Sequence, residues 1–325
     1  MSDAETIVGV VDVGANTIHL AVVAVAPDGS LRSLADETEL VRLGADVSAT
    51  GRIGAQRMER ALNVIAAQVE LARSLQPVAV LGVATEGVRA AANSVEFIER
   101  VERACGLPLR LVTGEQEAAL TYWGATWRWA NEATRQAVLD LGGGSLEIVV
   151  GQRRRVEWRV SLPLGSGALT ARHIHADPPA DVELDAVRAE VVAALTSITP
   201  PLPVARAAAC GGTATTLPRL AAAPPPGESP SPHAEDVTTL TRDGMRRTLA
   251  RLTRQPLAML SAATGVEEGR LRLLGPGAVA LLGAMECLGV SSLTVSPEGI
   301  REGVALAYAH GGDEWPALAS AGAGW

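Results

Sequence analysis

The chain has 325 residues, of which 47% are hydrophobic, and a formal net charge of −8. This length is sufficient for two domains that each bury a core of their own. The acidic balance argues against DNA as a partner, because nucleic-acid binding relies on a basic surface. Apolar runs such as 7–11 and 18–26 are too short to span a membrane. A membrane is therefore not expected as a partner. The start, MSDAET, lacks the features of a secretory signal, so we expect a soluble, cytoplasmic protein.

Lysine and cysteine usage excludes several kinds of chemistry. All 28 basic residues are arginine, which excludes a Schiff-base lysine and a P-loop lysine. Cys105, Cys210 and Cys287 are too few and too scattered for a disulfide framework or a structural zinc site. Cys210 is expected to be buried and inert, because Thr216 stands where a cysteine-phosphatase loop needs Arg.

The first half of the chain predicts strands that alternate with helices. Residues 7–26 form a β-branched run, a turn carrying Asp12 and a second apolar run, which predicts a hairpin. The other elements expected before residue 130 are a helix over 58–72, a strand over 77–85, a helix opened by a capping box of Asn93 and Glu96, a strand over 107–114 and a helix from Glu115 towards Trp129.

The second half repeats this plan. Residues 137–150 again read as strand, glycine turn and returning strand, with Asp140 in the position of Asp12. The basic turn Arg153–Arg155 is expected at a solvated hairpin tip. The later elements expected are a strand over 156–162, a glycine turn at 165–167, a helix over 184–198, a strand over 204–212, a surface loop over 221–236 and a frayed tail from Gly311.

The alternation predicts an α/β fold with largely parallel sheets covered on both sides. The repeated hairpins indicate two similar halves that face each other. We expect an N-terminal domain over 1–131, a C-terminal domain over 132–310 and a flexible tail over 311–325.

The segment Asp140-Leu-Gly-Gly-Gly-Ser145 is the clearest chemical signal. Glycines let backbone N–H groups approach phosphate oxygens, and an acid at the head of such a loop can hold Mg²⁺. Glu147 lies two residues past Ser145 and shares its face of the returning strand. A plain glycine-rich hairpin with a solvated Asp140 is the alternative.

Other segments carry weaker signals. The Asp12 turn can bind phosphate or can be an ordinary hairpin turn, and the Gly-Gly-Thr turn at 211–213 should lie at a strand end, where ligands of α/β sheets bind. Glu115 and Glu117 either complement a helix dipole or supply a general base. Arg89 follows a strand and is either a phosphate clamp or a surface residue.

Taken in order, these segments resemble the exopolyphosphatase/guanosine pentaphosphate phosphohydrolase family over roughly residues 7–308. The matching segments are VDVGANTIHL, VATEGVRAAAN, VTGEQEA, VLDLGGGSLEIVVG, LPLGSGALT, ACGGTATTL and SPEGIREG. The resemblance implies two ASKHA-type (actin-like, ribonuclease H-like) domains with an active site in the cleft between them, and a homodimer as a plausible assembly.

The family's motifs fall on definite positions here. The residues implied are Glu117 and Arg89 as catalytic; Asp140, Glu147 and Asp12 as metal ligands; and Gly14, Asn16, Gly142, Gly143, Gly144, Ser145, Gly211, Gly212 and Thr213 as phosphate-binding residues. Three positions depart from the frequent family pattern, namely Ala15, Gly211 and Ala168, and they bear on substrate affinity.

The expected activity is hydrolysis of a terminal phosphoanhydride with Mg²⁺ or Mn²⁺, first of all in inorganic polyphosphate. The alternatives are a pppGpp phosphohydrolase or nucleoside triphosphatase, a kinase on the same fold, and a non-catalytic regulator that binds polyphosphate or a phosphorylated guanosine nucleotide. The position of Glu117 at a helix start favours water as the acceptor.

Overall fold

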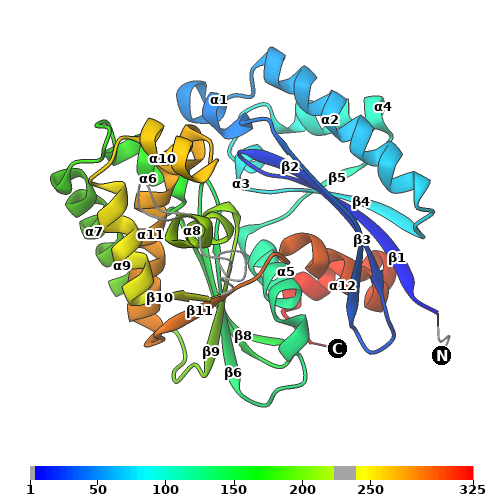
Figure 1. The fold of residues 1–325 in the computed structure, drawn as a ribbon. Coiled ribbons are helices and arrows are strands. Elements are labelled where there is room, and N and C mark those ends of the chain that lie inside the picture. The colour runs from blue at the N-terminus through cyan, green and yellow to red at the C-terminus, as the bar shows by residue number, and fades with distance from the viewer. Residues whose placement is uncertain (1–3, 223–238, 325) are drawn as a thin grey trace. The chain divides into compact units, whose positions relative to one another are not determined.

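The computed structural model describes residues 4–222 and 239–324, which form two compact units (Figure 1). Unit 1 comprises residues 1–132, 153–156 and 298–325, and unit 2 comprises residues 133–152 and 157–297. This division differs from the predicted one, because the last 28 residues belong with the N-terminal unit rather than with the C-terminal domain and a flexible tail. The predicted loop over 221–236 lies almost wholly outside the described residues.

Unit 1 is built on a five-stranded sheet of order β3-β2-β1-β4-β5. The strands are β1 (Thr6–Val13), β2 (Thr17–Val25), β3 (Leu31–Leu40), β4 (Ala79–Ala84) and β5 (Leu109–Leu111). The helices are α1 (Leu43–Thr50), α2 (Ala55–Ser74), α3 (Glu86–Arg89), α4 (Ser94–Cys105), α5 (Gly114–Thr126), α12 (Ile300–Gly311) and α13 (Trp315–Ala321), with short 3₁₀ turns at Trp127–Trp129 and Gly312–Glu314.

Helices cover both faces of this sheet (Figure 1). Side chains alternate along a strand, so Val11, Ile18 and Leu20 pack on the face under α2 and α4. The opposite face, which carries Val10, Asp12 and Ala21, lies against α12. Asp12 therefore lies on the face that the C-terminal segment covers.

Helices α5 and α12 cross at a contact that only glycine allows. A Cβ on Gly303 would lie 1.8 Å from the carbonyl oxygen of Leu120, and one on Gly124 would lie 1.9 Å from that of Gly299. Because no side chain separates the two backbones, the C-terminal segment is fixed directly against the helix that carries Glu117.

Unit 2 contains a six-stranded sheet of order β10-β11-β9-β6-β7-β8. The strands are β6 (Arg135–Leu141), β7 (Leu146–Gln152), β8 (Arg155–Leu162), β9 (Arg206–Cys210), β10 (Thr239–Thr241) and β11 (Ser292–Val295). The helices are α6 (Ser166–His173), α7 (Asp181–Thr196), α8 (Gly212–Ala222), α9 (Arg242–Leu252), α10 (Leu257–Thr264) and α11 (Glu268–Leu288). Cys210 is buried, as predicted.

The two sheets share one topology. In each, a central strand pairs antiparallel with the next strand and parallel with a later one: β1 with β2 and β4, and β6 with β7 and β9. The predicted repeat and the α/β fold class are thus confirmed, and this repeated strand order is the ASKHA-type arrangement. The sheets are mixed rather than largely parallel, since hairpins connect their first strands.

Three local predictions need correction. Asn93 makes no capping bond to its own helix; its side chain instead exchanges hydrogen bonds with the backbone of Ile53. The tail is not frayed through residue 321, because α13 buries Trp315. Helix α11 is long and apolar enough to cross a membrane, unlike the apolar runs 7–11 and 18–26. However, 67% of its most apolar 18-residue stretch is buried, which is typical of a core helix.

Candidate active site

The Asp12 turn closes with a backbone bond that recurs in unit 2. The N–H of Gly14 donates to the carbonyl oxygen of Thr17 over 3.0 Å, and the N–H of Gly142 donates to that of Ser145 over the same distance. The carbonyl oxygen of Asn16 accepts two further backbone N–H groups, from residues 41 and 42, which ties the turn to the end of β3. Two equivalent rigid turns therefore follow Asp12 and Asp140.

Asp12 lies beside a histidine and an arginine that sequence reasoning did not connect with it. It is the cross-strand partner of His19, whose ring nitrogens contact the hydroxyls of Thr17 at 2.5 Å and of Thr38 at 2.8 Å. The guanidinium of Arg301, at the start of α12, also acts electrostatically on Asp12. The motif PEGIREG marked Arg301 as a helix entry, but only the fold brings it to β1.

Arg301 is buried beside Glu302, which is also buried, and close to Asp36, which is exposed. It donates to the carbonyl oxygen of Leu20 over 3.3 Å and to Asp36 over 3.1 Å, and it lies 3.8 Å from Glu302. Burial acts to lower the pKa of Arg301, but Glu302 and Asp36 outweigh burial and raise that pKa. Burial raises the pKa of Glu302, and Arg301 opposes this. The two charges therefore stabilise each other under the sheet.

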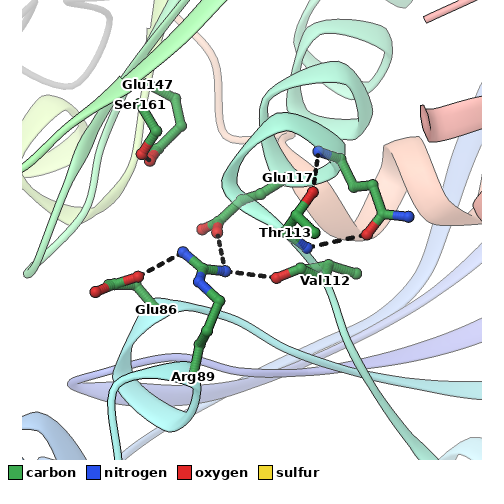
Figure 2. Close-up of polar contacts among 8 residues, drawn as sticks. Glu86, Arg89, Val112, Thr113, Glu117, Glu147 and Ser161 are labelled. Carbon is green, nitrogen blue, oxygen red and sulfur yellow. Dashed lines mark hydrogen bonds and ion pairs between the residues drawn. The ribbon is translucent and has the colours of Figure 1, made fainter. Parts of the chain in front are cut away.

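Arg89 and Glu117 contact each other within unit 1 (Figure 2). The Nη1 group of Arg89 donates to the carbonyl oxygen of Val112 over 2.5 Å and lies 3.5 Å from Glu117 Oε2, while its Nη2 group donates to Glu86 over 2.5 Å. Glu117 is only 9% exposed, whereas Glu115 is exposed. The structure thus separates the two acids: Glu117 is enclosed beside a cation and Glu115 faces solvent.

Helix α5 begins with a capping box that fixes the position of Glu117. The hydroxyl of Thr113 accepts from the N–H of Gln116 over 3.2 Å, and the side chain of Gln116 accepts from the N–H of Thr113 over 2.9 Å (Figure 2). Gln116 also donates to Ser320 of α13 over 2.9 Å. The C-terminal helix therefore supports the first turn of α5.

Replacing the cap should have a small, measurable effect. We expect Thr113→Ala to lower the free energy of unfolding by about 1 kcal/mol, because the N–H of Gln116 loses its acceptor. Urea unfolding followed by circular dichroism measures this change. Ser74→Ala, at the C-terminal end of α2, is the control for loss of a hydroxyl at a helix end. Equal unfolding free energies for Thr113→Ala and the wild type would contradict the stabilising role of the cap.

In unit 2, backbone hydrogen bonds from the start of α6 hold one side of the glycine turn that follows β6. The carbonyl oxygens of Gly142, Gly143 and Gly144 accept from the N–H groups of residues 166, 168 and 165 at the start of α6. In a trans peptide the N–H points opposite to the C=O, so the N–H groups of residues 143–145 point away from α6. This leaves a row of backbone donors in the orientation that an anion-binding turn needs.

Gly165 makes this arrangement possible. A Cβ at that position would lie 2.3–2.5 Å from backbone atoms of Gly143, Gly144 and Ser145. The sequence predicted a glycine turn at 165–167, but α6 already begins at Ser166, so Gly165 alone precedes the helix and lets it approach the first turn.

Asp140 and Glu147 lie directly opposite each other on β6 and β7. Cross-strand partners share one face of a sheet, and like charges in this position destabilise the pair unless a cation offsets them. Glu147 is 1% exposed and accepts from the hydroxyl of Ser161 over 2.6 Å (Figure 2). The pair thus places two carboxylate groups, which are possible metal ligands, side by side on one face of the sheet.

The Gly-Gly-Thr turn adjoins the same carboxylate. Asp140 is the parallel-strand partner of Cys210, and a Cβ on Gly211, whose φ is +90°, would lie 3.1 Å from Asp140 Oδ1. The guanidinium of Arg270, on α11, packs over Gly212, where a Cβ would lie 2.6 Å from Nη1. Sequence reasoning missed Arg270, because nothing in the spacing of α11 connects it with residue 212.

Thr213 follows in the first turn of α8. Its side chain is 1% exposed and packs against Gly277 of α11, and its hydroxyl has no hydrogen-bond partner among the described residues. Unit 2 therefore brings together Asp140, Glu147 and both glycine turns.

The carboxylates of unit 2 fit magnesium or manganese better than zinc. No group of three or more His, Cys, Asp or Glu side chains suited to a metal occurs among residues 4–222 and 239–324. Mg²⁺ characteristically binds one or two carboxylates and completes its shell with water and substrate phosphate. The opposed pair Asp140 and Glu147 meets that requirement, whereas a closed zinc site needs more protein ligands.

Comparisons with known proteins show the family of the chain. The sequence profile of the Ppx/GppA phosphatase family matches residues 22–310. The chain belongs to the Ppx/GppA phosphatase family. It is therefore related to phosphohydrolases by sequence over most of its length.

Individual Ppx/GppA relatives match over nearly the whole chain. Exopolyphosphatase 1 of Mycobacterium tuberculosis is 32% identical over 307 residues, which cover 92% of this chain and 87% of the relative. Exopolyphosphatase 2 of the same organism is 32% identical over 321 residues, covering 94% and 99%. The crystal structure of the Aquifex aeolicus member of the Ppx/GppA family aligns with a TM-score of 0.79 and 28% identity, covering 95% of this chain and 99% of that one.

Proposed function

We propose that this phosphatase is an exopolyphosphatase, which releases orthophosphate from the end of inorganic polyphosphate. The observation that carries the proposal is the turn at residues 142–145, whose backbone donors lie next to the opposed carboxylates Asp140 and Glu147. This combination suits a chain end that carries several phosphate oxygens. Relatives of similar length are named exopolyphosphatases.

In unit 2, Asp140 and Glu147 are the residues that would hold Mg²⁺ or Mn²⁺. Asp12, the equivalent carboxylate of unit 1, stays a predicted metal ligand. When bound, the ion supplies positive charge that offsets the phosphate oxygens. In unit 2 the hydroxyl of Ser161 fixes the rotamer of Glu147. In unit 1, Arg301 keeps a countercharge beside Asp12.

The phosphate-binding residues in this proposal are the two glycine-rich turns of unit 2 and the turn that follows Asp12. Their members are Gly14, Asn16, Gly142, Gly143, Gly144, Ser145, Gly211, Gly212 and Thr213. Backbone N–H groups at these positions donate to phosphate oxygens without an intervening side chain. Arg270 would extend this surface at Gly212.

Glu117 is the proposed general base and Arg89 its positioning partner. Glu117 takes a proton from water, the water oxygen bonds to the terminal phosphorus, and the bridging P–O bond breaks towards the shortened chain. Arg89 contacts Glu117 at 3.5 Å, and its remaining N–H groups can donate to the phosphate. Its bond to the carbonyl oxygen of Val112 holds the guanidinium in place.

A phosphate-release panel tests this function. We expect release from polyphosphate of short and long chain in Mg²⁺ or Mn²⁺, and loss of release when EDTA removes the metal. Faster release from pppGpp, ATP or ADP than from any polyphosphate would contradict the proposed substrate. A requirement for an added acceptor would indicate a kinase, and polyphosphate binding without release would indicate a regulator.

Several expectations from the sequence stay predictions beside this proposal. They are a cytoplasmic location, a homodimer, and a function without DNA or a membrane as partner. Gel filtration with light scattering measures the oligomeric state directly.

A further inference from the structure

Positive charge is concentrated in unit 2, in and just after α9. Residues 242–254 contain five arginines and a single acid, Asp243, although the net charge of the chain is −8. Asp243 already forms an ion pair with Arg246. The segment therefore contains no other acid that could offset its remaining arginines, and a surface of this kind attracts anions.

Three arginines of this region are exposed and unpaired. Arg247 lies on α9, Arg254 lies two residues past the end of that helix, and Arg219 lies in the last turn of α8. None of these three side chains forms a hydrogen bond or an ion pair with any residue of 4–222 or 239–324. We call Arg219, Arg247 and Arg254 the arginine patch. Its charge is available to a ligand, unlike that of Arg246.

Contacts between α8 and α9 bring the members of this patch together (Figure 1). The Nη1 group of Arg251 donates to the carbonyl oxygen of Leu220, the residue after Arg219, over 3.2 Å. Arg247 precedes Arg251 by four residues and so lies on the same side of α9. The N–H of Arg254 donates to the carbonyl oxygen of Arg251 over 3.2 Å. The arginine patch therefore lies around the C-terminal end of α8.

Helix α8 connects the arginine patch with the Gly-Gly-Thr turn. The helix begins at Gly212 and contains 11 residues, which corresponds to roughly 16 Å along its axis. Gly212, Thr215 and Arg219 are spaced by three and four residues, so they lie on one face of the helix. Thr215 and Arg219 are exposed on that face, and residues 212–222 include no acid. A face without negative charge thus leads from the turn to the patch.

We propose that the arginine patch binds the distal part of a long polyphosphate chain that is also bound at the Gly-Gly-Thr turn. This inference rests on the proposed exopolyphosphatase activity and adds a second binding site to it. Guanidinium groups suit phosphate oxygens, because their planar fork donates two parallel hydrogen bonds. A chain of three phosphates is too short to span α8, whereas a long chain reaches both ends of the helix. The patch therefore favours long chains over short ones.

Residue types around the patch favour an inorganic polyanion over a nucleic acid. Proteins that bind single-stranded DNA or RNA stack the bases on aromatic side chains beside a basic groove. Residues 206–222 and 239–264, which include α8 and α9, contain no Phe, Trp or Tyr. They offer positive charge and hydroxyl groups, such as that of Thr215, but no ring on which a base can stack. A polyphosphate chain has no bases and needs only the charge.

Isothermal titration in EDTA, which prevents turnover, tests the proposal with long-chain polyphosphate, tripolyphosphate and a single-stranded oligonucleotide as probes. The patch variant combines Arg219→Gln, Arg247→Gln and Arg254→Gln. The control variant changes the net charge equally by replacing three exposed arginines of unit 1: Arg60→Gln, Arg103→Gln and Arg155→Gln. We expect the affinity for the long chain to fall roughly tenfold in the patch variant, the scale of three exposed charge contacts, and to stay unchanged in the control. The preference for the long chain over tripolyphosphate should shrink by the same factor.

Initial rates of phosphate release in Mg²⁺ give a second readout: the KM for long chains should rise in the patch variant without a matching fall in kcat. Equal affinity of the wild type and the patch variant for the long chain would overturn the proposal, as would an equal loss in the control or tighter binding of the oligonucleotide. Patch-dependent binding by a wild type that releases no phosphate would support the patch and overturn the exopolyphosphatase proposal alone. The single variant Arg247→Gln keeps the test possible if the triple variant does not fold.

Discussion

Glu117→Gln is expected to lower the rate of phosphate release by roughly a hundredfold to ten-thousandfold, the range for loss of a general base. The side chain is buried at the first turn of α5 and lies 3.5 Å from Arg89. Glutamine keeps the shape and can still accept from Arg89, but it cannot take a proton from water. Initial rates of phosphate release from polyphosphate in Mg²⁺ measure the effect.

Substrate binding should survive this change. We expect the affinity of Glu117→Gln for polyphosphate to stay close to that of the wild type, because the glycine turns and Arg89 are unaltered. Glu115→Gln is the matched control: Glu115 lies two residues away, faces solvent and should keep the wild-type rate. Wild-type turnover in Glu117→Gln would remove Glu117 from the mechanism, and equal losses in both variants would indicate a general effect on the helix.

Arg301→Met should destabilise the protein by about 3–5 kcal/mol at pH 8, the range for breaking a buried ion pair. The substitution leaves Glu302 buried under the sheet without the cation that opposes the burial-raised pKa. The pKa of Glu302 in the folded variant therefore rises further, whereas in the unfolded chain the group ionises near about 4.3. Above that pH the unfolded state binds fewer protons than the folded state.

The loss of stability in Arg301→Met should consequently grow as pH rises from 5 to 8. Urea unfolding at both pH values measures this growth relative to the wild type. The double variant Arg301→Met with Glu302→Gln removes the titrating group and should show no such pH dependence, although the amide can still accept from the N–H of Gly299. A deficit in Arg301→Met that is equal at pH 5 and pH 8 would show that Glu302 is not its cause.

The position of Arg301 also has a functional consequence. Residue 301 is the second residue of α12, yet its guanidinium contacts the carbonyl oxygen of Leu20 and acts on Asp12. A substitution near the C-terminus can therefore affect the turn that follows β1. Helices α5 and α12 also cross closely at Gly124 and Gly303. The same C-terminal segment therefore packs against the helix that carries Glu117.

Sequence alone predicted the local geometry of unit 2 well. The segment from Asp140 to Glu147 encodes its own hairpin, because β-branched runs flank glycines that can turn the chain. The register that places the two carboxylates opposite each other follows from the length of that turn. The repeat at residues 7–26 is as local, which is why both hairpins and the repeated fold could be recognised before any tertiary contact was known.

Predictions from local sequence patterns were incomplete where a polar group bonds to a residue far away in the chain. Asn93 and Glu96 have the spacing of a capping box, but the side chain of Asn93 bonds to Ile53, 40 residues away. The basic turn at Arg153–Arg155 forms the predicted hairpin tip, with Arg153 and Arg155 exposed, but nothing in its own sequence shows that Tyr122 and Trp123 bind its carbonyl oxygens. In each case a tertiary hydrogen bond replaces the local or solvent contact that the pattern implies.

The sequence by itself determined the two hairpins and the acids and glycines of their turns, since these depend on residue type and on spacings of a few residues. Only the tertiary structure decided that Glu117 rather than Glu115 is enclosed, that residues 298–325 complete unit 1, and that Arg301 lies beside Asp12. The physical reason is that these features arise from packing between segments far apart in the chain, where burial and charge pairing rather than local conformation determine the outcome.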